Sequence, residues 1–316
     1  MAVYEVFSHP ELRRYKATLC SKATLIMLAI LVLTFIPPLF VVYRSYGFWI
    51  KEATYREIPT VAFKHDILLI VELNNAGAEG NYLTYSTFQM YNQLQEQRLR
   101  IPVISSREVD SNGDGKFDHL IFDLDLPLTD TENVLGVKLL LFFYYKLLKF
   151  SSFHMESLGY IEHESARPGA RLAVYGDLRF HQKQALAHKG IDNRFNDSII
   201  DSSSTFAEEY DLSMIFKKYS QRNVTTVMPN PYKVWTSGRA AGAPFRISAT
   251  IDYPEESYLI SYTPGFWYLI KWGWVQYVAV LALFLFLFER VKVFIFHNQL
   301  VTTIVDRPFN AKNKLT

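Results

Sequence analysis

The residues best placed to do chemistry lie in the run DSNGDGKFD at positions 110–118. Side chains with oxygen atoms occupy positions 1, 3, 5 and 9 of the run, and the main-chain carbonyl at position 7 can supply a further oxygen. A glycine at position 6 permits the sharp bend that a compact ion cage requires. This spacing predicts a structural calcium site. Its ligands would be the side chains of Asp110, Asn112, Asp114 and Asp118 and the main-chain carbonyl of Lys116.

The predicted loop departs from an EF-hand, because its twelfth position is Ile121 rather than glutamate and its flanks have the composition of strands. It is more similar to the hairpin loops of extracellular β-proteins, whose weak sites fill at the millimolar calcium outside cells. The alternative is a polar hairpin turn that binds no ion, since asparagine, aspartate and glycine are also favoured in turns for backbone reasons.

Other arrangements of reactive residues are less specific. Histidines and glutamates gather in the segment after position 150, but they lack a close pair of ligands with a third, and we interpret them as a solvated face. They are His154, Glu156, Glu162, His163 and Glu164. No G-x-S-x-G, Walker, H-E-x-x-H or dinucleotide-binding glycine motif is present in the sequence, so we expect no enzyme activity.

Charge and cysteine content exclude two further properties, nucleic-acid binding and an internal disulfide. The formal net charge is +2 and no basic block occurs, so we expect no binding of nucleic acid. Cys20 is the only cysteine, which rules out a disulfide within the chain. It precedes an apolar segment, where a thiol is either acylated or left unmodified.

That segment, residues 23–43, carries no charge and matches the roughly 20 residues that cross the hydrocarbon as a helix. We predict that Pro37 and Pro38 bend or end this helix near its exit. A cleaved signal peptide would have a shorter apolar core and a small-residue cleavage site, so we predict an uncleaved anchor.

A second span is predicted over residues 265–288, where Lys271 near the entry is the only charge and aromatic residues gather as at a membrane interface. A third apolar stretch, Val134–Phe150, is interrupted by three lysines and is predicted to be a buried strand instead.

Basic residues flank both spans on the sides away from the central region, which predicts cytosolic tails over residues 1–22 and 289–316. They are Arg13, Arg14, Lys16 and Lys22 before the first span and Arg290, Lys292 and Arg307 after the second. Residues 44–264 would then form an extracellular domain. Sequons for N-glycosylation at Asn196 and Asn223 favour the same topology.

Short apolar runs separated by turn signals predict that the central domain is β-rich, and a β-sandwich is the simplest closure. Its size allows a core large enough to dispense with disulfides. The predicted strands are 61–73, 82–88, 101–107, 119–126, 135–147, 171–180, 245–253 and 258–262, with short helices at 91–98 and 208–219. The predicted fold is thus two transmembrane α-helices flanking a large β-sandwich-like extracytoplasmic domain.

With these elements in place, the chain resembles the transmembrane protein 231 family of the ciliary transition zone. The resemblance extends from the first residue to about position 304. The segments that carry it are MAVYEVFSHP, LCSKA, PPL, GFW, DSNGDGKFD, ENVLGV, YGDLRFHQKQ, QRNVTTV, GRAAGAPF, SYTPGFW, WVQYV and FERVKVFIFHNQLVTTI.

The resemblance implies a structural subunit of the tectonic-like complex, also called the Meckel-syndrome module, in the transition-zone membrane. Its expected partners are the membrane and soluble subunits of that complex and the lipid bilayer. The implied role is in the diffusion barrier between cilium and plasma membrane, in ciliogenesis and in Hedgehog signalling. The alternative is an ion-channel subunit or an accessory subunit of a transporter or flippase, although such ectodomains are usually rich in disulfides.

Overall fold

Strand β7, Val134–Leu147, is buried on both of its faces. Leu139, Leu141 and Phe143 face one core, whereas Leu140 and Phe142 face a second core on the other side. All five side chains have no exposed surface. This two-sided burial explains the unbroken apolar run, and it confirms that the segment is a strand.

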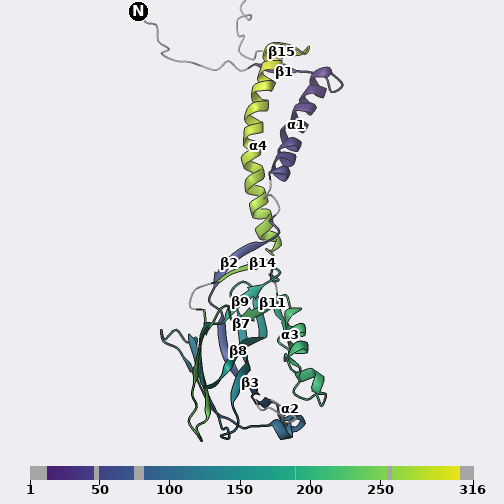
Figure 1. The fold of residues 1–316 in the computed structure, drawn as a ribbon. Helices are drawn as coiled ribbons and strands as arrows, with labels where there is room; N and C mark the ends of the chain where they lie inside the picture. Colours follow the sequence, from purple (N-terminus) through teal and green to yellow (C-terminus); the bar gives the residue numbers. More distant parts are fainter. Residues whose placement is uncertain (1–12, 46–49, 75–81, 189, 255–257, 307–316) are drawn as a thin grey trace, which may run out of the picture. The chain divides into compact units, whose positions relative to one another are not determined.

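The computed structural model describes residues 13–45, 50–74, 82–188, 190–254 and 258–306. The chain divides into two compact units: Glu52–Pro264, and Met1–Lys51 together with Gly265–Thr316. The first unit is β-rich and the second is helical (Figure 1). The outer parts of the predicted tails, residues 1–12 and 307–316, lie outside the described residues.

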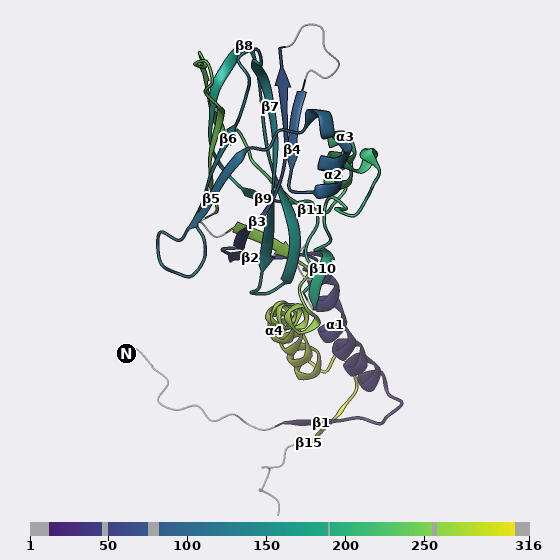
Figure 2. The same ribbon diagram turned by 90° about the horizontal axis from the view of Figure 1, so that it is seen from below.

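The β-rich unit is built on a nine-stranded sheet in the order β4-β3-β7-β8-β13-β6-β5, with β10 and β12 also paired to β8. The sheet curves into a half-barrel (Figure 2). Besides β7, its strands are β3 Thr60–Leu73, β4 Tyr82–Ser86, β5 Val103–Val109, β6 His119–Leu126, β8 Ser152–Asp177, β10 Ile191–Phe195, β12 Tyr232–Ser237 and β13 Phe245–Asp252.

Strand β8 holds the two portions of the sheet together. Its first part pairs antiparallel with β7, from Phe153 to Gly169. Its last part, from Arg171 to Asp177, pairs parallel with β13. The larger core lies between the two portions and includes inward-facing side chains of β3, β6, β7 and β13. The β-rich prediction is therefore confirmed, but the main sheet of the described residues is a half-barrel where a two-sheet sandwich was predicted. Strand β8 also runs far beyond the predicted strand 171–180.

Short helices cover the outer side of β3, β7 and β8 and enclose the second core. They are α2 Gln89–Leu94, the 3-10 helices η1 Glu96–Arg98 and η2 Ala207–Tyr210, and α3 Leu212–Ser220, which fall within or beside the two predicted helical segments. Phe88, next to α2, meets Phe142 edge-on at 5.8 Å between ring centroids. The hydroxyl of Tyr219 in α3 accepts a hydrogen bond of 2.7 Å from the Thr226 amide.

The predicted solvated face after position 150 is wrong for Glu156, which is 3% exposed. Its carboxylate lies 2.7 Å from the Lys64 ammonium of β3 and accepts a 2.9 Å hydrogen bond from the Ile199 amide. Burial opposes the charge on Lys64, but hydrogen bonds to Glu156 and Asp66 outweigh it and raise the pKa of Lys64. Glu156 is therefore buried as a paired charge between the sheet and the segment that follows β10.

Two small ribbons complete the β-rich unit. Strands β9 Arg179–Gln182 and β11 Val224–Val227 form one, and β2 Ala53–Glu57 and β14 Tyr258–Tyr262 form the other. In the second ribbon Ala53 lies opposite Tyr262. The entry and the exit of this unit are therefore adjacent.

The helical unit pairs α1, Lys22–Arg44, with α4, Phe266–His297. Ser21 caps α1 by accepting a 3.3 Å hydrogen bond from the Thr24 amide. The Tyr277 hydroxyl of α4 donates to the Phe35 carbonyl of α1 at 3.1 Å. Beyond the helices, β1 Arg14–Lys16 pairs antiparallel with β15 Ile304–Asp306. The described parts of both tails are thus joined.

Among the described helices, only α1 is long enough and apolar enough to cross a membrane. Its most apolar stretch has a mean hydropathy of 2.8. It continues through Pro37 and Pro38 to Arg44, so these prolines do not end it. The helix expected over residues 265–288 is also present and extends to His297, but its crossing of the membrane stays a prediction.

The buried Gly169 of β8 provides a test of the packing of β12 against β8. A Cβ atom there would overlap the indole ring of Trp235 in β12. We expect Gly169→Ala to lower the free energy of unfolding of the full chain by about 1–3 kcal/mol through overpacking, measured by denaturant unfolding in detergent micelles. In a Trp235→Leu background the same change should cost much less, and equal costs in both backgrounds would contradict this packing.

Candidate functional site

The loop between β5 and β6 contains all five predicted calcium ligands and is held by Asp118. This side chain is only 7% exposed. One of its carboxylate oxygens accepts hydrogen bonds from the amides of Ser111 and Asn112 at 2.6 and 3.2 Å, and the other accepts from the Asn112 side chain at 3.2 Å. The Asp118 carbonyl accepts from the Tyr253 amide at 2.6 Å, which ties the loop to the end of β13.

The other oxygen-bearing side chains of the loop also accept hydrogen bonds from its backbone. Asp110 accepts from the amides of Gly113 and Gly115 at 2.7 and 2.9 Å. Asn112 accepts from the Asp114 amide, and Asp114 accepts from the Lys116 amide, both at 2.8 Å. Gly113 and Gly115 have φ angles of +73° and +82°, in the left-handed region that favours glycine.

Hydrogen bonds of this kind are also made by a polar hairpin turn. Within the part of the chain that the structure describes, no group of three or more histidine, cysteine, aspartate or glutamate side chains is arranged to hold a metal ion. The predicted ligand side chains share one loop, and their oxygens accept hydrogen bonds from its backbone amides. Calcium binding at this loop stays a prediction.

The two predicted glycosylation sites lie on the β-rich unit in different surroundings. Asn196 directly follows β10 and is exposed. Asn223 precedes β11 and is half-buried, and its carbonyl accepts a 2.8 Å hydrogen bond from the Lys183 amide. Thr225 of the second sequon is only 5% exposed. Asn196 is therefore the more accessible acceptor in the folded unit.

The β-rich unit also contains a cavity of about 580 Å³ that the sequence did not predict. Tyr82, Tyr91 and Tyr210 line it together with Glu72 and Asp211. The Tyr91 hydroxyl is hydrogen-bonded to that of Thr84, and Glu72 lies 2.6 Å from the Lys138 ammonium. These groups already have partners that stabilise the second core and the adjacent sheet edge.

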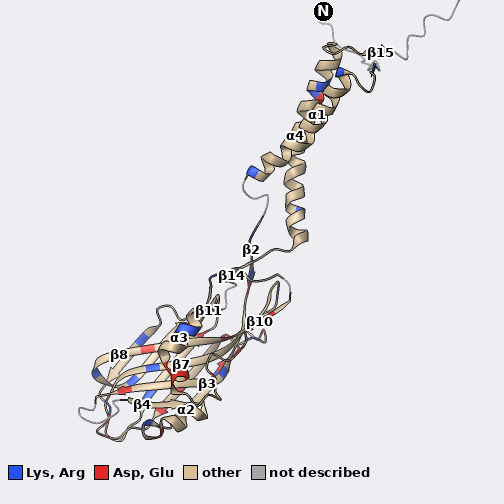
Figure 3. Ribbon diagram, turned by 90° about the vertical axis from the view of Figure 1, so that its right-hand side faces the viewer, with Lys and Arg blue, Asp and Glu red and all other residues tan. Residues whose placement is uncertain are grey.

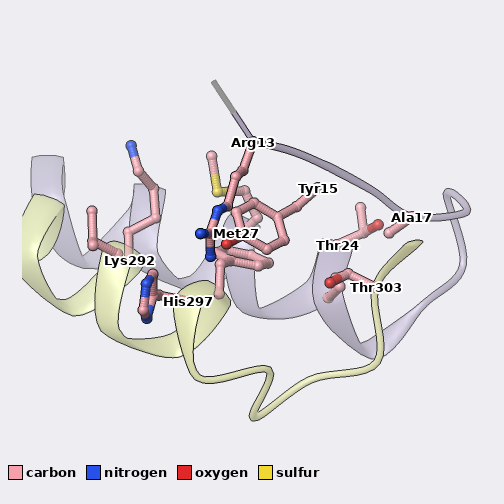
Figure 4. A pocket seen from close by; sticks show the side chains of 11 residues that line it. Arg13, Tyr15, Ala17, Thr24, Met27, Lys292, His297 and Thr303 are labelled. Atoms are coloured by element: carbon pink, nitrogen blue, oxygen red, sulfur yellow. The ribbon is translucent and has the colours of Figure 1, made fainter. Parts of the chain in front are cut away.

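A larger cavity, of about 870 Å³, lies in the helical unit between β1 and the adjoining ends of α1 and α4 (Figure 4). Arg13, Lys292 and His297 line it, and Tyr15 and Met27 lie beside them. The sequence singled out Arg13 and Lys292 for topology alone, and it did not single out His297. Only the pairing of β1 with β15 and of α1 with α4 gathers them around one space.

Cys20 precedes α1 and is exposed. It lies one residue before the Ser21 cap, outside the set of residues that line the larger cavity. The thiol is therefore open to acylation, which stays a prediction.

The Asp118 contacts predict a measurable role for the loop. Asp118→Ala removes the acceptor of three hydrogen bonds and should lower the free energy of unfolding by about 1–3 kcal/mol in denaturant titrations of the full chain. Asp123→Asn, at an exposed carboxylate of β6, is the control and should change it little. If the loop acts only as a turn, millimolar calcium will not shift the wild-type transition relative to EGTA. A calcium-dependent stabilisation lost in Asp110→Asn would instead establish the metal site.

Comparison with known proteins assigns the family. A family model described as Transmembrane protein 231 matches residues 1–305. The Transmembrane protein 231 chains of Bos taurus and Xenopus tropicalis are 52% identical over 305 residues and 51% identical over 304 residues, respectively. These alignments cover 96% of this chain and 95% and 96% of the two relatives. The Gallus gallus relative is 48% identical over 309 residues, covering 98% of this chain and 95% of the relative. With agreement over nearly the whole length, this chain belongs to the transmembrane protein 231 family.

Proposed function

We propose that this chain is a two-pass membrane protein with both tails in the cytosol and the β-rich unit outside. The observation that supports this topology best is the pairing of β2 with β14. Because Ala53 lies opposite Tyr262, the chain enters and leaves the β-rich unit at neighbouring points. A unit built in this way suits two spans that start from the same side of a bilayer.

The helical unit supports the same topology from its own contacts. α1 and α4 lie side by side, and the strands beyond their tail ends pair in β1 and β15 (Figures 1 and 3). Both helices are nearly free of charged residues along their middle (Figure 3). The basic residues around β1, the start of α1 and the end of α4 support a cytosolic position for this end by the positive-inside rule.

In this proposal α4 is the second span, over residues 265–288. Trp267, Trp272 and Trp274 lie near its first end, as expected where rings meet a membrane interface, and Lys271 can extend its ammonium to the headgroups. The remaining turns, which contain Glu289, Arg290 and Lys292, would lie at the cytosolic interface.

We propose further that the chain is a structural subunit of the tectonic-like complex in the ciliary transition-zone membrane, where it contributes to the diffusion barrier, ciliogenesis and Hedgehog signalling. Its partners would be the membrane and soluble subunits of that complex. Membership of the transmembrane protein 231 family over residues 1–305 is the observation that carries this proposal. The absence of the common catalytic motifs from the sequence supports a role in assembly rather than in catalysis.

The topology predicts glycans on the β-rich unit. In cells, the full chain should lose apparent mass on treatment with an N-glycosidase, and Asn196→Gln should remove most of the shift because Asn196 is the exposed acceptor. Asn223→Gln is the matched variant and should have a smaller effect. Tags on both tails should be digested by protease only after the plasma membrane is permeabilised. A tail digested on intact cells would contradict the two-pass arrangement.

The proposed role predicts where the chain concentrates and what it binds. A tagged full chain in ciliated cells should form a focus at the base of the cilium and should retain tectonic and Meckel-module proteins on affinity purification. A single-pass anchor carrying the same tag serves as the control. Uniform plasma-membrane staining without these proteins would exclude the role, and purification with a flippase or currents from the purified chain would favour the channel or flippase alternative.

A further inference from the structure

We propose that the outward face of the β2–β14 ribbon binds the outer leaflet of the bilayer, with Ile58 and Leu259 inserted among the lipid headgroups. The inference rests on the proposed topology, because it needs α4 to be the second span. It adds a lipid contact of the β-rich unit that two spans alone do not require.

The ribbon has one face turned to the core and one face turned away from it, because successive side chains of a strand point to opposite faces. Tyr55 of β2 and Ile260 and Tyr262 of β14 belong to the larger core and are buried. Arg56 and Leu259, which alternate with them, lie opposite each other in the ribbon and are exposed. These two side chains therefore belong to the outward face.

Apolar side chains occupy part of this outward face. Leu259 is 62% exposed, and Ile58, two residues after Arg56, is 37% exposed. Leu148 and Phe150, in the turn after β7, are exposed as well. Single exposed apolar side chains are ordinary, whereas a group drawn from three segments beside one ribbon indicates a surface that is covered in the working protein.

Contacts with the ribbon hold the turn after β7 next to it. The Glu57 carboxylate accepts hydrogen bonds from the amides of Leu148 and Lys149 at 2.8 and 3.0 Å. The Phe150 ring meets the Tyr55 ring edge-on, with 5.0 Å between their centroids. The exposed side chains of this turn therefore flank the ribbon.

Positively charged side chains accompany the apolar ones. Arg56 lies opposite Leu259 in the ribbon, and the Lys149 ammonium donates to the Arg56 carbonyl at 3.3 Å. The Lys116 ammonium donates to the Ile58 carbonyl at 2.8 Å. Long cationic side chains beside apolar ones are typical of a membrane interface, because their stems cover apolar surface while their charged ends reach headgroup phosphates.

The length of the chain points to lipid as the occupant of this face. Strand β14 ends at Tyr262 and α4 begins at Phe266. Four steps of about 3.8 Å between neighbouring Cα atoms join them, so these two residues lie within about 15 Å of each other. In the proposed topology Trp267 and Trp272 mark the outer interface. The end of the ribbon is thus tethered close to the headgroups.

The test measures depth-dependent fluorescence quenching in the full chain, reconstituted in phosphatidylcholine nanodiscs. Because Cys20 is the only cysteine, a Cys20→Ser background accepts a single label. The environment-sensitive fluorophore NBD on Leu259→Cys should lose about half its emission when the lipids carry a nitroxide near the headgroup, as expected for a label among headgroups. Val278→Cys, exposed within α4, should be quenched by nitroxides placed deeper on the acyl chain.

Val103→Cys is the matched control. Val103 is 74% exposed at the start of β5, the end of that strand away from the loop whose Lys116 contacts Ile58. A label there should lose about a tenth of its emission or less. Equal quenching at Val103 and Leu259 would show that the fluorophore itself partitions into lipid, and the proposal would be wrong.

A second variant separates binding from simple nearness along the chain. With the label at Leu259, Ile58→Asn should reduce the quenching by about half, because it removes an apolar side chain that holds this face at the interface. Val103→Asn is the corresponding control and should leave the quenching unchanged. Equal denaturant midpoints of the two variants would show that both remain folded. If Ile58→Asn then has no effect, the tether alone explains the nearness and the proposed contact does not exist.

The label in α4 separates this proposal from the topology on which it rests. If Val278→Cys is quenched and Leu259→Cys is not, the second span stands and the lipid contact of the ribbon is wrong. If neither label is quenched, α4 does not cross the bilayer, and the inference fails together with the proposed topology.

Discussion

Burial of β7 and its neighbours on both faces is the constraint on which the rest of the β-rich unit depends. With Cys20 as its only cysteine, the chain cannot staple this unit by a disulfide. Stability must come from apolar surface removed from water. The half-barrel core supplies one layer, and α2, η2 and α3 supply the second by covering Leu140 and Phe142. The buried carboxylate of Glu156 is tolerated because Lys64 and the Ile199 amide satisfy it.

Two small β-ribbons bring together the chain segments at which each unit begins and ends. The β2–β14 ribbon brings together the two ends of the β-rich unit, and the β1–β15 ribbon brings together the described tails of the helical unit. Both ribbons join segments more than 200 residues apart in the sequence. Such closure leaves the two ends of each unit side by side.

Within the helical unit, residues distant in the sequence converge around one cavity without forming a sequence motif. Positive side chains from the start of β1 and the end of α4 meet around one cavity. The loop at 110–118 shows the opposite case, because its motif is clear in the sequence while its side chains are already engaged by their own backbone.

The sequence by itself determined the helix α1, the β-rich class, the strand character of β7 and the position of most strands, because these depend on local composition and periodicity. It also identified the family. Only the tertiary structure decided that β8 runs through both sheet portions, that Glu156 is buried, and that Arg13 and Lys292 share a cavity. Each of these depends on partners distant in the chain, such as Lys64 for Glu156, and no local pattern encodes which distant residue will be the partner.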